Sequence, residues 1–305
     1  MKFLSAALAV MLLWVATAAG RGMEPHIQRG DFPAVKTLHN VTYGVADGVK
    51  LKMDIYLPAQ ERKKDVPVIL SVHGGAWRVG GRMTKNSPLL AILLRHGYAV
   101  VPIDYRLAPR FKFPAQIEDC KCAVRFLRAH AKLLHIDPNR IGAMGESAGG
   151  HLVALLGLTG PSAGFDGNGG WQNESSSVQA VADLFGPSDL TDWDTNGHEE
   201  YVWTEEHVFG AVTGSDPLLK RASPVNYISP NAPPFFILHG DLDNVVPVSQ
   251  SIELYNKLKA AGDPATLMIV TNFGHGEAPP RLMPKPSEKH FTEAIADFFD
   301  WNLKK

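Results

Sequence analysis

Residues 140–152 read RIGAMGESAGGHL, and this short stretch carries the strongest structural signal in the chain. It opens with a strand-like run, passes through a tight turn that contains Gly145, Ser147 and Gly149, and continues into a helix-like run. Such a turn strains the backbone of its central residue, and the two glycines leave room where a Cβ would clash. We therefore expect the Ser147 hydroxyl to project above a sheet edge at a helix N-terminus, where free N–H groups favour negative charge.

Strand-like and helix-like runs alternate on both sides of this turn. Continuous apolar runs at 67–72, 98–103 and 235–238 predict strands that are covered on both faces, as in a parallel sheet. Amphipathic stretches lie between such runs, the longest of them from Pro114 to about Leu134. The alternation predicts an α/β fold with an open, doubly wound sheet.

The first residues differ from the rest of the chain. MKFLSAALAVMLLWVATAAG (1–20) carries one lysine, an apolar run over 3–15 and small residues at 16–18. This pattern is typical of a secretory signal peptide and is too short for a stable membrane span, with an uncleaved anchor as the alternative. We expect a signal peptide at 1–18, one catalytic domain at 19–305, a secreted or periplasmic location and no stable membrane association after cleavage.

The composition excludes some classes of partner. The 305 residues include 30 Lys and Arg against 31 Asp and Glu, so no overall charge would attract nucleic acid. The only cysteines, Cys120 and Cys122, would point about 200° apart on a helix, which disfavours a mutual disulfide. No histidine or further cysteine joins them at ligand spacing, so we expect free thiols and no metal site.

One long segment interrupts the alternation of strands and helices. Residues 160–223 are rich in Gly, Ser, Asn, Asp and Trp and contain one convincing strand pattern. A long irregular insertion in a compact domain is commonly a lid or a binding loop, although surface decoration is the alternative.

A serine hydroxyl becomes a nucleophile only beside a base, which a third group usually orients. His275 follows the last strand-like run in a glycine-flanked loop, whereas its rival His239 sits within a strand end and suits a buried, locally bonded role. Asp243 lies in the loop after another strand and can reach a histidine, whereas Asp241 is better placed to brace the turn. The predicted set is Ser147, Asp243 and His275, in the chain order of an α/β-hydrolase.

The segment HGGAW (73–77) is the candidate for the oxyanion hole, which an acyl-transfer site also requires. It follows an apolar strand pattern, and its small residues let backbone N–H groups approach a substrate oxygen. We expect Gly74, Gly75 and Ala148, the residue after the serine, to form an oxyanion hole. Whether Ala76 also donates is left open, and His73 is interpreted as structural.

Six motifs occur in a fixed order along the chain. They are HGGAW (73–77), DYRLAP (104–109), GESAGGHL (145–152), FGPSDL (185–190), HGDLDNVVP (239–247) and FGHG (273–276). In these motifs the chain resembles the α/β-hydrolase superfamily, and within it the carboxylesterases of the hormone-sensitive-lipase-like and bifunctional feruloyl and acetyl-xylan esterase-like group. The resemblance covers roughly residues 40–304. It implies a mostly parallel eight-stranded sheet with helices on both faces, and the roles of nucleophile, acid, base and oxyanion donors for the residues named above.

The resulting hypothesis is a secreted serine esterase of short-chain or aromatic (acetyl, feruloyl) esters, with a small molecule or plant polysaccharide as substrate. Two-step acyl transfer requires no cofactor. Trp77 and Phe185 are candidates for the walls of the substrate site, although ordinary packing explains them equally well. The alternatives are an aryl-formamidase-like amidase and a catalytically silent binding domain on the same fold.

Overall fold

The computed structural model describes residues 35–58, 65–82, 87–192, 199–211 and 216–304. These residues belong to one compact unit, Pro33–Lys305. The expected signal peptide at 1–18 lies outside the described residues and stays a prediction.

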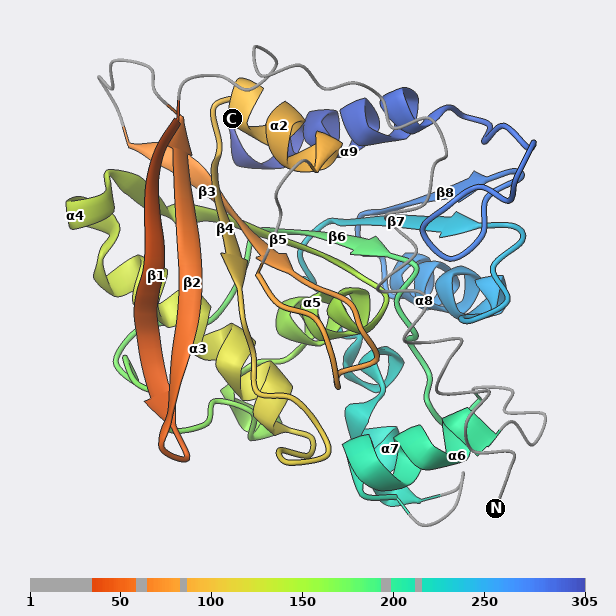
Figure 1. Cartoon of the computed structure of the whole chain (residues 1–305), viewed down its shortest axis with the longest axis horizontal. Helices are drawn as coiled ribbons and strands as arrows, with labels where there is room; N and C mark the ends of the chain where they lie inside the picture. Colours follow the sequence, from red (N-terminus) through yellow and green to blue (C-terminus); the bar gives the residue numbers. More distant parts are fainter. Residues whose placement is uncertain (1–34, 59–64, 83–86, 193–198, 212–215, 305) are drawn as a thin grey trace. The chain divides into compact units, whose positions relative to one another are not determined.

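An eight-stranded sheet organises the described residues (Figure 1). Its strands follow the spatial order β1-β2-β4-β3-β5-β6-β7-β8. β2 pairs antiparallel with β1 and with β4, whereas all other neighbouring strands pair in parallel. The strands are β1 (Val35–Ala46), β2 (Val49–Pro58), β3 (Val66–Val72), β4 (Ala99–Ile103), β5 (Ile136–Glu146), β6 (Ala180–Leu184), β7 (Phe235–Gly240) and β8 (Ala265–Val270). The predicted doubly wound, mostly parallel sheet is confirmed.

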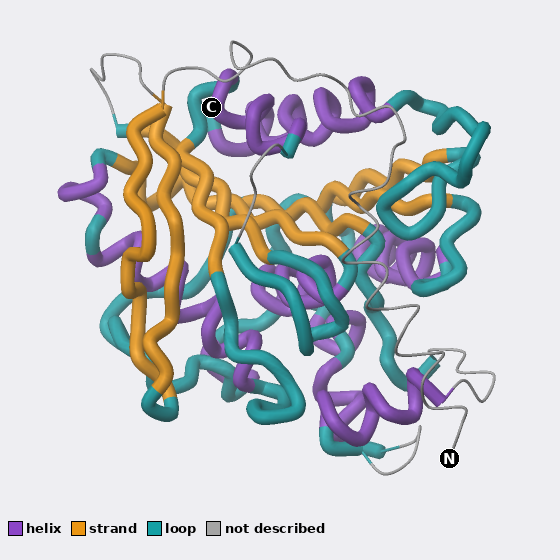
Figure 2. Tube along the Cα trace, viewed as in Figure 1, coloured by secondary structure: helices purple, strands orange, loops and turns teal. Residues whose placement is uncertain are grey.

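Helices cover both faces of this sheet (Figures 1 and 2). α2 and α9 lie on one face, and α3, α5 and α8 lie on the other. The α-helices are α2 (Pro88–Arg95), α3 (Ala115–Ala129), α4 (Ala131–Leu134), α5 (Ala148–Leu158), α6 (Glu199–Thr204), α7 (Pro217–Ala222), α8 (Val248–Ala260) and α9 (Glu288–Leu303). Shorter turns of helix occupy Pro161–Ala163, Glu205–Phe209 and Pro224–Tyr227.

The covered strands divide the apolar side chains between two cores. Leu93 of α2 and Phe299 of α9 pack in the core on one face, and Ile117 of α3 and Leu155 of α5 pack in the core on the other. All four side chains are fully buried. Burying such a side chain stabilises the fold by about 1.5–3 kcal/mol, so these two cores fix the sheet between its helices.

The structure also corrects two expectations about boundaries. The pattern predicted a strand from Arg140, but β5 begins at Ile136, which pairs with Val66 at the start of β3. The amphipathic stretch ends at Leu134 as expected, although it is divided into α3 and α4. Pairing between distant strands decides these ends, and local periodicity carries no information about it.

The parallel strands deliver the segments of interest to one edge of the sheet. Ser147 follows the carboxyl end of β5, Asp243 follows β7, and His275 lies beyond β8. Parallel neighbours end at the same edge, where open α/β sheets bind their ligands. Within the insertion at 160–223 the structure describes β6, α6 and α7, while 193–198 and 212–215 lie outside the description.

Candidate active site

Ser147 occupies the turn between β5 and α5 in a conformation that few residues adopt. Its φ is 55° and its ψ is −121°, and its N–H donates to the carbonyl of Leu184 on β6 at 2.8 Å. The carbonyl of Ser147 accepts the N–H of His151 at 3.0 Å and so begins the helix. Backbone strain of this kind costs on the order of 1–3 kcal/mol and persists only where the surroundings enforce it. The predicted strained turn is present.

Gly149 shows how tightly this turn packs against the sheet. A Cβ built on Gly149 would lie 2.1 Å from the carbonyl oxygen of Val72, at the end of β3. Because both atoms are held by backbone, no side-chain rotation relieves that clash. A glycine is therefore required two residues after Ser147, as the motif predicted.

Three side chains from distant segments meet at this turn. His275 Nε2 lies 2.8 Å from Ser147 Oγ, and His275 Nδ1 lies 2.7 Å from Asp243 Oδ2. The serine hydroxyl can donate to Nε2, and Nδ1–H can donate to the carboxylate. The structure therefore brings the three predicted residues together in the geometry of a nucleophile, a base and an orienting acid.

Asp243 is enclosed and fully hydrogen-bonded. Its side chain has no exposed surface, and its Oδ1 accepts the N–H groups of Val245 at 2.8 Å and Val246 at 2.9 Å. Burial alone raises the pKa of this carboxyl, but hydrogen bonds from His239 and His275 outweigh burial and hold the pKa of Asp243 well below its usual range. The carboxylate is thus charged across the pH range in which an imidazole titrates.

The rival residues take the positions that the sequence indicated. Asp241 is exposed, and its Oδ1 accepts the N–H of Asn272 at 2.7 Å, which braces two loops against each other. His239 is fully buried at the end of β7, and its Nε2 lies 2.9 Å from the carbonyl of Val246. A second contact, in which His239 Nε2 lies 3.2 Å from Asp243 Oδ2, was not predicted.

Phe185 and Trp77, proposed as substrate walls, are packed inside the protein. Phe185 is 6% exposed, and its ring meets the His275 ring edge-on with centroids 4.8 Å apart. Trp77 is 2% exposed, and its Nε1–H donates to His151 Nδ1 at 3.2 Å. These contacts support the base and the 73–77 loop, and they leave little of either ring to face a substrate.

The 73–77 loop lies directly against the serine. A Cβ on Gly74 would lie 2.9 Å from the carbonyl oxygen of Glu146 and 3.3 Å from Ser147 Cβ, so a larger residue would push this backbone away from the serine. Ala76 and Trp77 both have positive φ, 49° and 58°, and the carbonyl of Gly75 accepts two N–H groups of the following turn at 3.0 Å. The oxyanion donors predicted in this backbone, Gly74 and Gly75, and the N–H of Ala148 at the start of α5 stay a prediction.

Neighbouring groups hold that loop in place. The His73 ring stacks on Tyr105 with centroids 4.2 Å apart, and the Tyr105 hydroxyl donates to the His73 carbonyl at 3.1 Å. From the insertion, the Trp203 ring lies 4.8 Å below the Arg78 guanidinium, and Phe209 packs edge-on against Trp77. The insertion therefore contacts the candidate oxyanion loop, although the expected lid role stays a prediction.

His151 is a packing residue near the start of α5. It is fully buried, accepts from Trp77 and donates Nε2–H to the carbonyl of Ala222 at 2.7 Å. Burial lowers the pKa of His151 to about 4, an effect that the bond to Ala222 only partly offsets. It is therefore neutral at pH 7 and ties α5 to the 73–77 loop and to the end of α7.

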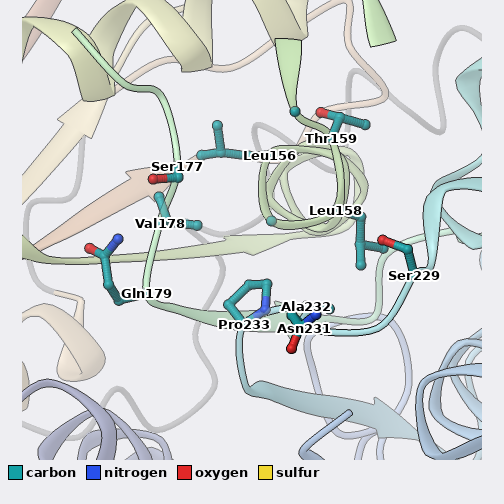
Figure 3. A pocket seen from close by; sticks show the side chains of 12 residues that line it. Leu156, Leu158, Thr159, Ser177, Val178, Gln179, Ser229, Asn231, Ala232 and Pro233 are labelled. Carbon is teal, nitrogen blue, oxygen red and sulfur yellow. The ribbon is translucent and has the colours of Figure 1, made fainter. Parts of the chain in front are cut away.

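A cavity of about 380 Å³ lies at the opposite end of α5 from Ser147 (Figure 3). Leu158 and Thr159 line it from the helix, Val178 and Gln179 from the segment before β6, and Asn231 from the segment before β7. No charged side chain lines it. The cavity offers no nucleophile beside a base. The candidate catalytic residues of the described part of the chain lie at the other end of α5, around Ser147.

Three further predictions concern groups outside this site. Cys120 and Cys122 are free and buried, as expected. Within the described ranges, no three His, Cys, Asp or Glu side chains are placed to hold a metal ion. None of the described helices has both the length and the apolar composition that a membrane span requires.

Comparisons with known proteins agree with this geometry. Residues 53–258 match the BD-FAE family. Esterase LipQ of Mycobacterium tuberculosis is 33% identical over 241 residues, which are 78% of this chain and 56% of LipQ. The chain thus spans little more than half the length of that curated relative.

Solved structures share the fold over most of the chain. A truncated carbohydrate esterase from gut microbiota superposes with a TM-score of 0.75 and 30% identity, covering 90% of this chain and 99% of that one. Est2 of Thermogutta terrifontis, solved with propionate bound, gives a TM-score of 0.69 and 26% identity over 88% of this chain and 93% of Est2. The predicted α/β-hydrolase fold is confirmed, and the descriptions of these relatives as esterases support the predicted esterase class.

Proposed function

This chain belongs to the BD-FAE family, and we propose that it is a serine carboxylesterase that acts on short-chain acyl or feruloyl esters. One observation carries the proposal: hydrogen bonds of 2.8 Å and 2.7 Å connect Ser147 through His275 to Asp243. A domain that only binds needs no such arrangement. This arrangement also requires three loops to be held together, and it includes a strained backbone at Ser147.

In the proposed reaction, Ser147 Oγ attacks the ester carbonyl while His275 Nε2 takes the hydroxyl proton. Asp243 accepts Nδ1–H and stabilises the imidazolium that forms. The tetrahedral oxyanion lies against backbone N–H groups of the Gly74–Gly75 loop and of Ala148. His275 returns the proton to the leaving alcohol, and water then attacks the acyl-enzyme by the same route.

The substrate class is inferred from the relatives and from the insertion. One solved neighbour is a carbohydrate esterase, and another was solved with propionate, a short acid, bound to it. The described helical turns of the insertion, 199–209, read EEYVWTEEHVF and carry four glutamates. This acidic sequence is unlike the apolar lid that long-chain lipid esters require, so we propose acetyl and feruloyl esters, including those of plant polysaccharide.

The proposed location is outside the cytoplasm. Its support is the leader-like sequence at 1–18, which falls outside the described residues. Expression of the full chain followed by N-terminal sequencing of the exported protein tests this, and an unprocessed N-terminus would contradict it.

Labelling with a fluorophosphonate tests the nucleophile. The reagent should add a single adduct, and peptide mapping should find it on Ser147. Ser147→Ala should lose the adduct and reduce ester hydrolysis by at least about four orders of magnitude while the protein stays folded. Ser175→Ala, at an exposed serine, is the matched control and should behave as the unaltered chain. Normal hydrolysis by Ser147→Ala would refute the assignment.

A substrate series tests the specificity. The p-nitrophenyl esters of acetate and butyrate should be hydrolysed faster than the dodecanoate, and acetate or ferulate should be released from xylan. An aryl formamide, assayed beside them, separates the esterase from the amidase alternative. Preference for dodecanoate or for the formamide would overturn the proposed substrate class without touching the nucleophile.

A further inference from the structure

Two histidines contact the carboxylate of Asp243, and the proposed mechanism uses only one of them. His275 reaches Asp243 Oδ2 from the loop after β8 at 2.7 Å. His239, at the end of β7, reaches the same oxygen at 3.2 Å from the protein interior. His239 has no exposed surface, so solvent cannot replace it as a partner.

The neighbours of His239 fix its tautomer. Its Nε2 faces two acceptors, the Val246 carbonyl at 2.9 Å and Asp243 Oδ2 at 3.2 Å, so this nitrogen must carry a proton. Its Nδ1 lies 2.6 Å from Ser251 Oγ on α8, and a hydroxyl can donate to an unprotonated nitrogen. A neutral imidazole with the proton on Nε2 satisfies all three partners.

We propose that His239 is a positioning residue that acts on the catalytic base through Asp243. Its Nε2–H holds Asp243 Oδ2 where His275 Nδ1–H can reach it. It also draws part of the carboxylate's charge away from His275. This inference rests on the proposed esterase function, because it concerns the reactivity of His275 towards Ser147.

The route continues into the body of the fold. Ser251 lies in the first turn of α8, is fully buried, and fixes the ring of His239 from the far side. The chain of contacts therefore runs from Ser147 through His275, Asp243 and His239 to Ser251. The carboxylate of Asp243, although it lies in a loop, is thus held by contacts that reach α8. A catalytic base needs an orienting group that is fixed in this way.

Other charged groups face this cluster from neighbouring strands. Asp183 of β6 is fully buried, and one of its carboxylate oxygens has no hydrogen-bond partner. Burial, only partly offset by the hydrogen bond from the Gly186 N–H, raises the pKa of Asp183 to about 6. Glu146, at the end of β5, interacts electrostatically with His275. Every variant below retains both acids, and Ser251→Ala also retains His239 as the neighbour of Asp183.

Removing the N–H donor tests the proposal. His239→Phe keeps an aromatic ring but leaves Asp243 Oδ2 with one donor fewer. We expect kcat for p-nitrophenyl acetate to fall about 10- to 100-fold, the range for losing a hydrogen bond to a charged group, with KM nearly unchanged. The freed charge favours protonated His275, so the acid limb of the kcat/KM profile should move to higher pH.

Two further variants separate positioning from packing. His239→Gln places an N–H near the position of Nε2 and should restore most of kcat and return the acid limb towards its original pH. Ser251→Ala removes only the group behind the ring and should shift kcat and the limb in the same direction as His239→Phe, by less. The variant His130→Phe makes the same substitution at the end of α3, away from the site, and should change neither quantity.

The outcomes distinguish this inference from the proposed function. If the unaltered chain hydrolyses no ester, the proposed function fails. If it is active and His239→Phe folds with unchanged kcat and pH profile, the positioning role is wrong. Equal loss in His239→Gln and His239→Phe, without a shift of the acid limb, would assign His239 to packing alone. Should His239→Phe fail to fold, an unshifted profile in Ser251→Ala would overturn the proposal.

Discussion

The two ends of α5 differ in backbone strain, in charge and in the space around them. At its N-terminus the backbone of Ser147 is strained, and Asp243 and His275 converge on the hydroxyl. At its C-terminus Leu158 and Thr159 line a cavity of about 380 Å³ without a charged side chain. The comparison teaches that open space does not locate this site. Strain, buried charge and close backbone approach occur together at one end of the helix.

The strongest way to break the comparison is to remove the charge at the N-terminal end. Asp243→Asn keeps the size of the side chain but removes the acceptor that fixes His275 Nδ1–H. We expect kcat to fall by about four orders of magnitude, because the imidazole loses its required tautomer. Stopped-flow hydrolysis of p-nitrophenyl acetate measures it.

The matched control lies two residues away. Asp241→Asn preserves an oxygen that can accept the N–H of Asn272, and Asp241 is exposed. Its kcat should stay within about threefold of the unaltered chain, because the change removes no contact with His275. A larger loss for Asp241→Asn than for Asp243→Asn would reverse the assignment of the acid.

A smaller effect concerns stability near the same end of α5. In the folded chain the pKa of His151 is lowered to about 4, against about 6.5 when unfolded, because burial disfavours its charged form. The unfolded state therefore binds more protons between these values. The stability contributed by neutral His151 is complete above pH 6.5 and is lost as the pH falls towards 4, by about 3 kcal/mol in total.

Urea unfolding of the unaltered chain and of His151→Gln measures this contribution. Between pH 7 and pH 4.5 the variant should lose about 2–3 kcal/mol less stability than the unaltered chain. Carboxylates elsewhere titrate in both proteins, so their contributions cancel when the two changes in unfolding free energy are subtracted. Parallel losses in the two proteins would show that His151 carries no such pH dependence.

The smallest effect on activity is expected at the C-terminal end. Leu158→Ala enlarges the cavity and should cost about 2 kcal/mol of unfolding free energy, since Leu158 also belongs to the core. Its kcat/KM for p-nitrophenyl butyrate should stay within about twofold. A strong loss of activity at full folding would mean that this cavity takes part in the reaction and would remove the contrast between the two ends.

Much of the fold follows from local pattern. The apolar runs at 67–72 and 98–103 fell within β3 and β4 or at their edges, and the turn at 145–149 has the strain that its glycines implied. The structure also brings Ser147, Asp243 and His275 within hydrogen-bond distance of one another, in agreement with their predicted positions after three strands. Helix and strand ends such as Ile136 were missed, since they depend on pairing with distant strands.

The substrate walls were harder to foresee. Trp77 and Phe185 are large apolar residues within the motifs HGGAW and FGPSDL, yet both rings are almost wholly buried against other groups of the site. The residue type and its closeness to a catalytic residue in sequence do not predict which face of an aromatic ring is exposed to a substrate. The contact between His239 and Asp243 had no signal at all, because an i to i+4 spacing in a loop after a strand predicts no direction for either side chain.

The sequence by itself determined an alternating α/β chain, a strained serine turn, and the identity and order of an acid and a base. These depend on periodicity, on glycine at fixed offsets and on residue chemistry, all of which are local. Only the tertiary structure decided that two histidines share one carboxylate and that Phe185 packs against the base. It also decided that the candidate catalytic side chains meet at the N-terminus of α5, whereas an uncharged cavity lies at its C-terminus. The contacts of His275 with Asp243, Ser147 and Phe185 join residues more than 30 positions apart in the chain. Parallel strand pairing and burial on the two faces of the sheet set these distances.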